Sequence, residues 1–143
     1  MTVIRSHSAP RPQPANVQKT PLLHDRQHEK VVGAIYEVAN VLGAGFLEKV
    51  YERALVVELR ARGLQAEAQA AIRVLYKGEL VGDYLADILV EGRLLIELKC
   101  VDSLSNEHIA QTLNYLKATD RHIALLVNFK HPKVEWKRIV HNF

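Results

Sequence analysis

The fold is decided by residues 87–99, which read Asp-Ile-Leu-Val-Glu-Gly-Arg-Leu-Leu-Ile-Glu-Leu-Lys. Two runs of Ile, Leu and Val flank a short Glu-Gly-Arg turn, a pattern typical of a β-hairpin. Acids on such strands lie half inside a core, where an ionised carboxylate is costly unless a cation or a hydrogen-bond partner compensates it. Asp87, Glu97 and Lys99 therefore indicate a divalent-metal site with a charged side chain beside it.

The register of this hairpin decides whether the two acids can act together. With a three-residue loop at 91–93, Asp87 lies directly opposite Glu97 on the same face of the sheet, about 5 Å away. Lys99 then lies on that face too, two positions beyond Glu97. A two-residue loop would place Glu97 on the other face. Because three-residue hairpins commonly carry a glycine-assisted bulge, we predict the first register, or a bulge that restores it.

The chemistry of such a site follows from its donor atoms. Hard cations such as Mg²⁺ prefer carboxylate and water oxygens. A metal held by Asp87 and Glu97 would polarise a phosphodiester and lower the pKa of a bound water. Lys99 would orient the attacking water or stabilise charge on the phosphate. The alternative is that Glu97 and Lys99 are exposed neighbours, since surface ion pairs are common and contribute little to stability.

The hydrophobic periodicity frames this hairpin with helices and further strands. A helical period predicts helices at 25–42, 46–62 and 106–118. Strand patterns predict strands at 70–76, 80–90, 94–101 and 123–127, and leave open an extra strand at 134–140. The continuously apolar run 123–127 is expected at the centre of the sheet. Four of the five prolines lie in residues 1–22, so we expect a disordered tail there and one domain over 23–143.

Composition narrows the class of protein. The 143 residues are 48% hydrophobic and 24% charged, which is ordinary for a soluble globular protein. The single cysteine, Cys100, cannot form an internal disulfide and favours a reducing compartment. No apolar run approaches the roughly 20 residues that span a bilayer. We therefore expect a cytoplasmic protein that does not enter a membrane.

The net charge of +3 hides an uneven distribution along the chain. Residues 25–116 contain 10 basic and 14 acidic residues, whereas residues 117–143 contain 6 basic and 2 acidic residues. The acidic section is where a cation site would lie. The basic section would suit phosphates, although a solvated basic face explains it equally well.

Two motifs resemble those of a known family. Asp87 with Glu97-Leu98-Lys99 resembles the motif of the PD-(D/E)xK nuclease superfamily, although Ala86 stands where that motif has proline. The segment 45–51, Gly-Phe-Leu-Glu-Lys-Val-Tyr, matches the pattern that names the GxxExxY proteins, a group placed in this superfamily. The resemblance extends over residues 25–143. It implies an α/β, restriction-endonuclease-like core, a mixed β-sheet flanked by helices.

The resemblance also implies an activity and its residues. The activity would be that of a Mg²⁺- or Mn²⁺-dependent nuclease hydrolysing nucleic-acid phosphodiesters, with DNA favoured over RNA. Asp87, Glu97 and Glu48 would hold the metal, the backbone carbonyl of Leu98 would add a ligand, and Lys99 would assist the nucleophile. Glu48 has the alternative role of a helix-start acid that interacts favourably with the helix dipole.

Two further residues are candidates for substrate binding. Gln111 and Tyr115 are four residues apart, so their side chains share one helix face. The pair is similar to a Gln-x-x-x-Tyr motif in the exonuclease-like branch of the superfamily, which implies contacts with a nucleic-acid strand. A helix-surface pair without function is the alternative. We expect Tyr51 to pack at the edge of the core with its hydroxyl toward the site.

The competing hypothesis is a non-catalytic nucleic-acid- or protein-binding module that retains the nuclease fold. The missing proline and the balanced charge of residues 25–143, with 16 basic and 16 acidic residues, favour this module. The sequence also leaves open whether the chain acts alone, as a homo-oligomer or with a partner protein that supplies recognition. Metal binding, with cleavage abolished by Lys99→Ala, would favour the enzyme.

Overall fold

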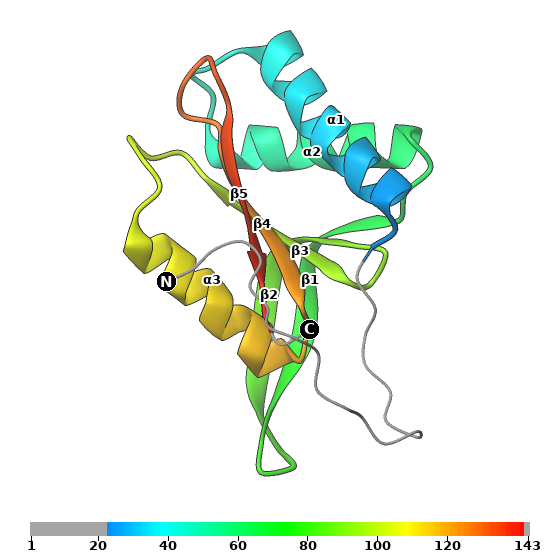
Figure 1. The fold of residues 1–143 in the computed structure, drawn as a ribbon, viewed down its shortest axis with the longest axis vertical. Helices are drawn as coiled ribbons and strands as arrows, with labels where there is room; N and C mark the ends of the chain where they lie inside the picture. Colours follow the sequence, from blue (N-terminus) through cyan, green and yellow to red (C-terminus); the bar gives the residue numbers. More distant parts are fainter. Residues whose placement is uncertain (1–22, 142–143) are drawn as a thin grey trace.

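A computed structural model of the chain describes residues 23–141, in which three helices and five strands form two layers of helix around one sheet (Figure 1). The predicted tail at 1–22 lies outside the described residues, as do residues 142–143. The elements are α1 (Asp25–Leu42), α2 (Glu48–Ala61), β1 (Ala66–Tyr76), β2 (Glu79–Val90), β3 (Leu94–Lys99), α3 (Asn106–Thr119), β4 (Ile123–Asn128) and β5 (Glu135–Val140).

Every helix and strand predicted from the periodicity is present, and three boundaries differ by two residues or more. Strand β1 begins at Ala66 rather than Ala70, because Ala66 pairs with Val90 and is buried. Helix α2 begins at Glu48 rather than at residue 46, since Leu47 still has extended backbone angles. Strand β3 ends at Lys99, because the Val101 N–H donates to the Asn128 side chain and leaves the sheet ladder.

The five strands follow the order β1-β2-β3-β4-β5. All neighbours are antiparallel except β3 and β4, which are parallel. Parallel neighbours need a crossover connection, and α3 supplies it. Strand β4 is buried at every position, as a continuously apolar run should be. It lies between β3 and β5, however, so β3 and not β4 is the middle strand.

Each face of the sheet packs against its own helices. Helices α1 and α2 cover one face and form the first core, while α3 covers the opposite face and forms the second core (Figure 1). The first core includes Val31, Ile35, Leu55, Leu59, Ile96 and Leu125. The second core contains Ile72, Ala86, Leu95, Ile109, Leu116 and Leu126. The predicted α/β arrangement, a mixed sheet flanked by helices, is confirmed.

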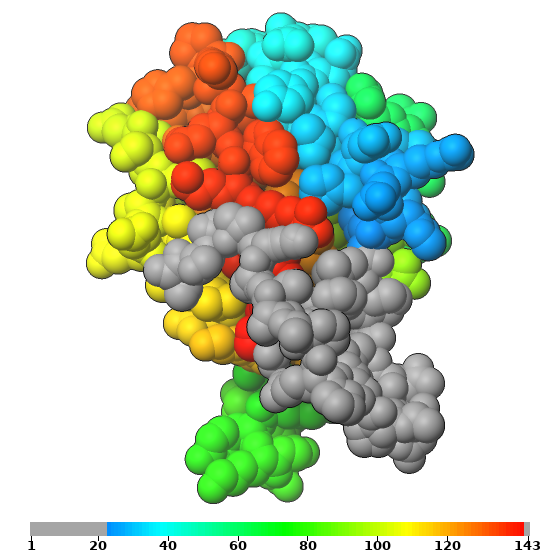
Figure 2. Space-filling view, in the orientation of Figure 1, coloured from blue at the N-terminus to red at the C-terminus, as the bar shows by residue number. Residues whose placement is uncertain are grey.

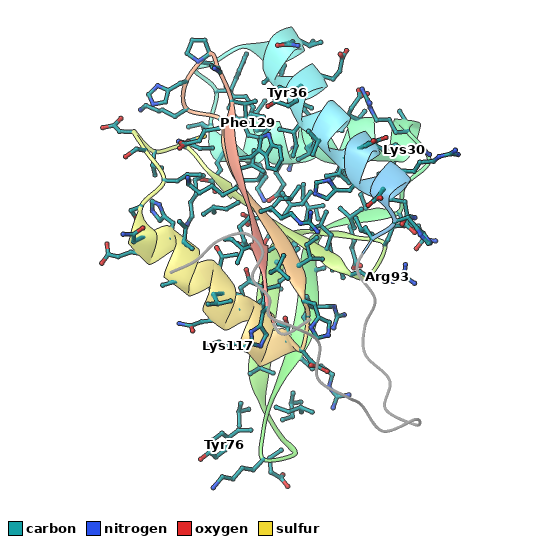
Figure 3. The ribbon with its side chains drawn as sticks, in the orientation of Figure 1. Lys30, Tyr36, Tyr76, Arg93, Lys117 and Phe129 are labelled. Carbon is teal, nitrogen blue, oxygen red and sulfur yellow. The ribbon has the colours of Figure 1, made fainter. Side chains whose placement is uncertain are left out.

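The hairpin between β1 and β2 extends beyond both cores. Figure 2 shows it in green, projecting from the rest of the molecule, and Tyr76 lies at its tip in Figure 3. Leu75, Tyr76 and Leu80 are all exposed there. The base of this hairpin, by contrast, lies inside the molecule, where Asp87 of β2 is near Glu97 of β3.

Candidate active site

The two acids of the hairpin lie where β2 and β3 stop pairing regularly. The last regular pair is Ile88 with Ile96, reached from the turn through consecutive opposed pairs. This register is set by the three-residue turn at 91–93, and Asp87 and Glu97 are the next residues beyond its last pair. The Leu98 N–H donates to Asp87 Oδ2 at 2.7 Å. The aspartate side chain therefore takes the place of the next ladder partner. The predicted register is confirmed for the three pairs from Val90–Leu94 to Ile88–Ile96.

Glu97 is a buried acid with one side-chain donor. It is 7% exposed, and the Tyr84 hydroxyl donates to its Oε2. The pKa of Glu97 is raised to about 7, chiefly by burial and also by the nearby charge of Asp87, although the Tyr84 hydrogen bond and the charge of Lys99 act to lower it. Because burial outweighs the compensation, this position favours an added positive charge.

Tyr84 links the acids to helix α3. Its ring stacks on that of Tyr115, with centroids 4.2 Å apart and an interplanar angle of 27°. Burial raises the pKa of Tyr115, and the charges of Glu97 and Asp87 add to the effect. Tyr115 is therefore brought to the site through Tyr84. Gln111 is exposed one turn earlier on the same helix.

Helix α2 contributes two more acids, Glu48 and Glu52. Burial raises the pKa of Glu48, the charge of Asp87 raises it further, and Lys99 lowers it. Glu48 thus lies within electrostatic range of the hairpin residues, although its side chain is exposed. Glu52, one turn later, is only 5% exposed and accepts hydrogen bonds from Lys49 Nζ at 3.1 Å and Gln69 Nε2 at 2.8 Å. Sequence reasoning did not identify Glu52 as a neighbour of the site.

Asp87 interacts both with Glu97 on β3 and with the acids on α2. Burial raises its pKa, the Leu98 N–H lowers it, and the charge of Glu52 raises it. The Gln69 side chain hydrogen-bonds to Asp87 as well and lowers the pKa. Lys99 is the cation that lowers the pKa of Asp87, Glu97 and Glu48 alike.

The backbone is distorted at Gln69, directly beside Asp87. Gln69 has a φ of 52°, in the left-handed region that non-glycine residues rarely adopt. The register of β1 with β2 is the same on both sides of it. Even so, Ile88 packs in the first core whereas Ala86, two residues away on the same strand, packs in the second. The β1–β2 ribbon is therefore twisted here, so that the side chains on either side of Asp87 face different cores. Asp87 lies at the point of this twist.

Tyr51 does not point toward the acids, contrary to expectation. It is fully buried and stacks on Phe129 with centroids 4.7 Å apart. Its hydroxyl donates to the Gly43 carbonyl at 2.6 Å and accepts the Phe46 N–H at 3.2 Å. A buried hydroxyl needs such partners, and here they come from the loop before α2. Tyr51 therefore fixes the loop that leads into Glu48.

The donor atoms suit a hard divalent cation. Asp87 and Glu97 offer carboxylate oxygens, the ligands that Mg²⁺ prefers, and the charge of both is only partly compensated. Within residues 23–141, no three His, Cys, Asp or Glu side chains lie close enough to hold one ion. An ion here would therefore rely on two carboxylates with main-chain or water oxygens, rather than on a cage of three side chains.

The sequence of the chain matches a known protein family. The model of the PD-(D/E)XK nuclease superfamily matches residues 25–139. The chain belongs to this superfamily. Its mixed sheet between helices is accordingly the restriction-endonuclease-like core that the motifs implied. Nucleases of the superfamily generally use divalent metal ions.

Similarity to individual known proteins is weaker than the match to the family. One similar solved structure is that of an alkaline exonuclease, LHK-Exo, from Laribacter hongkongensis. It is 17% identical, with a TM-score of 0.44, and the match covers 80% of this chain and 82% of the exonuclease chain. No curated protein matches the sequence. None of the described helices is both long and apolar enough to cross a membrane.

Proposed function

We propose that this chain is a nuclease that hydrolyses phosphodiester bonds in DNA rather than RNA, with Mg²⁺ or Mn²⁺ as its cofactor. One observation carries the proposal: Asp87 and Glu97 directly follow the last regular pair of one hairpin and interact with each other and with Lys99, in a member of the PD-(D/E)XK superfamily. Within that superfamily we assign the chain to the GxxExxY group, on the segment 45–51. A cytoplasmic location is part of the same proposal.

Asp87 and Glu97 would hold the cation, and the main chain would contribute to its shell. The N–H and C=O of a strand residue point toward the same neighbouring strand. Since the Leu98 N–H points at Asp87, the Leu98 carbonyl is expected to face the same side and to serve as a ligand. Glu48 would contribute through a bound water. When bound, the cation would polarise the phosphodiester and lower the pKa of a water.

The remaining residues of the site hold these groups in place or act on the phosphate. Tyr84 orients Glu97 by donating to its carboxylate, and Tyr115 holds Tyr84 through ring stacking. The ammonium group of Lys99 would stabilise negative charge that develops on the phosphate. Gln111, exposed on α3, would contact the backbone of the bound strand. Tyr115 would contact it with the part of its ring that remains exposed.

The test is a cleavage assay with matched variants. Plasmid DNA, single-stranded DNA and RNA are incubated with the protein over a range of Mg²⁺ and Mn²⁺ concentrations. Asp87→Asn and Lys99→Ala should each reduce the rate by about 10²- to 10³-fold, the usual cost of removing one electrostatic contact to a transition state. Asp83→Asn and Lys77→Ala are the controls, because both residues are exposed on the β1–β2 hairpin, and each substitution should leave the rate unchanged.

The same assay distinguishes the nuclease from the competing hypothesis of a non-catalytic module. Metal-independent binding of nucleic acid or protein, without cleavage and unaffected by Lys99→Ala, would identify a non-catalytic module. The observation that supports this alternative is Ala86, which stands where the motif has proline. A rate with RNA equal to that with DNA would contradict the choice of substrate while leaving the nuclease intact.

A further inference from the structure

A pocket with a volume of about 440 Å³ lies beside the proposed catalytic residues. It is formed where β3 and β4 end and where the loop from α1 enters α2. Cys100 follows β3, whereas Phe129 and Lys130 follow β4. The lining residues are Ala44, Gly45, Phe46, Leu47, Glu48, Cys100, Phe129 and Lys130.

The pocket adjoins the candidate active site, since Phe129, which lines the pocket, donates its N–H to the Lys99 carbonyl at 3.0 Å. Glu48, which the proposed function assigns to the metal site, also lines the pocket. Cys100, on the other wall, is bonded directly to Lys99 in the chain. A molecule in this pocket would therefore lie next to whatever Lys99 and Asp87 bind.

The surface of the pocket is mainly aromatic and aliphatic, with a cation at one side. Phe46 is 48% exposed and Leu47 is 79% exposed, although both side chains are large and apolar. Exposed apolar groups that cluster beside a polar site commonly mark a binding surface. Lys130 is exposed as well, so an ammonium group is available near the apolar wall.

The wall of the pocket is held rigidly from behind. Phe129 is buried and stacks on Tyr51, between β4 and the helical layer (Figure 3). Phe46 contacts Tyr51 edge-to-face at 6.1 Å between centroids, and its N–H donates to the Tyr51 hydroxyl. The Phe46 ring is thus presented by a loop fixed at both ends, which lowers the entropic cost of binding.

We infer that this pocket receives one unpaired nucleobase, from the nucleotide next to the phosphodiester that is cleaved. A base would stack on the exposed ring of Phe46 while its phosphate meets Lys130, the combination by which proteins bind single strands. The volume lies within the range of about 300–1,000 Å³ found for pockets that take small ligands. A paired base would first have to leave its duplex. The preferred substrate is therefore single-stranded DNA or a frayed end.

This inference rests on the proposed nuclease function, and its test uses both binding and cleavage. The full-length protein is titrated with fluorescein-labelled single-stranded and duplex DNA of one sequence, and Kd is read from anisotropy. The same oligonucleotides give kcat and KM with Mg²⁺. Phe46→Ala should raise Kd and KM for the single strand by roughly tenfold, in the range of one lost stacking contact. The duplex values should change far less.

Two further variants show whether the ring itself matters. Phe46→Tyr keeps the aromatic face and should restore single-strand binding, whereas Phe46→Leu keeps only the apolar volume and should not. Lys130→Ala should weaken single-strand binding too, with an effect that shrinks as salt concentration rises. Val57→Ala, an exposed apolar residue elsewhere on α2, is the matched control. Thermal unfolding of each variant verifies that the fold is intact.

The outcomes distinguish the pocket from the catalytic proposal. Equal losses on single-stranded and duplex DNA, or no loss on either, would overturn the pocket even if Mg²⁺-dependent cleavage is found. Phe46-dependent binding of the single strand without any cleavage would support the pocket and refute the nuclease. A protein that binds neither form of DNA refutes the inference, and its pocket then serves another ligand.

Discussion

Replacing Glu97 with glutamine should stabilise the metal-free protein, and only at neutral to alkaline pH. The Glu97 carboxyl is buried, and its folded-state pKa is about 7 against an ordinary value of 4.5. Between these two values the folded protein keeps a proton that the unfolded chain has lost. The groups that act on Glu97 are Asp87 and Tyr84 from β2, Lys99 from β3 and Tyr115 from α3.

The sign and size follow from proton linkage. A raised folded-state pKa contributes stability that is complete below pH 4.5 and is lost as the pH rises through 7. Ionising this group in the folded state at pH 8 should cost about 3 kcal/mol. Glutamine is neutral at every pH, and its amide oxygen can still accept the Tyr84 hydroxyl. The Glu97→Gln variant should therefore exceed the original protein in stability by about 3 kcal/mol at pH 8, and by less than about 1 kcal/mol at pH 5.

The assay is urea denaturation at pH 5, 6, 7 and 8 with a chelator present. The difference in free energy of unfolding between variant and original protein removes the titration of all other groups to first order. Glu67→Gln is the control, since Glu67 is exposed on β1 and should show no such pH dependence. At pH 8, added Mn²⁺ should stabilise the original protein more than the variant, because a ligand stabilises the state that binds it.

A difference that is the same at pH 5 and pH 8 would refute this reasoning. It would mean that Glu97 ionises as easily in the folded protein as in the unfolded chain. Its carboxyl would then already be compensated and would have no need of a bound cation.

The other predictions concern the residues that position the site and its helices. Tyr84→Phe removes only the donor to Glu97. It should lower the cleavage rate at least tenfold and the free energy of unfolding at pH 8 by about 1.5–3 kcal/mol. An unchanged cleavage rate would contradict a positioning role for Tyr84. Tyr51→Phe leaves the Gly43 carbonyl without its donor and should cost about 1–3 kcal/mol in urea denaturation. Ser105→Ala removes the N-cap of α3, whose hydroxyl accepts the His108 N–H, and should cost about 1 kcal/mol; a loss below about 0.3 kcal/mol would show that the cap contributes nothing.

The hairpin with its two acids was predictable because short-range rules determine it. Runs of Ile, Leu and Val predicted the strands, and the length of the Glu91-Gly92-Arg93 turn fixed the register. Asp87 and Glu97 are ten residues apart in the chain, so no distant packing was needed to bring them together. Helices with a clear apolar stripe were predictable for the same reason.

The tyrosine that contacts Glu97 was not predictable by these rules. Tyr84 and Asp87 are three residues apart on one strand, so regular alternation would direct them to opposite faces. They both reach Glu97 only because the ribbon turns over beside Gln69. Nothing in the sequence marks Gln69 for a left-handed backbone, since glycine and asparagine are the usual residues there. The left-handed backbone at Gln69 is therefore a local exception to strand geometry, and it lies beside Asp87 of the candidate active site.

The roles of Tyr51 and Glu52 depended on how α2 packs against the sheet. A tyrosine in an apolar stripe was correctly expected near the core, but the direction of its hydroxyl is set by the loop at Gly43 and Phe46. Glu52 lies four residues after Glu48, so it shares the same helix face. That spacing was the one signal for a second buried acid, and only the packing against Gln69 shows that it is used.

The central claim is that Asp87 and Glu97 bind one divalent cation between them. It is tested most directly by diffraction from crystals soaked in Mn²⁺, with data collected where manganese scatters anomalously. The account predicts one anomalous peak within coordinating distance of a carboxylate oxygen from each of the two residues, and no peak at that place in crystals of Asp87→Asn. Manganese bound elsewhere in the crystal, with the two carboxylates turned apart, would contradict it.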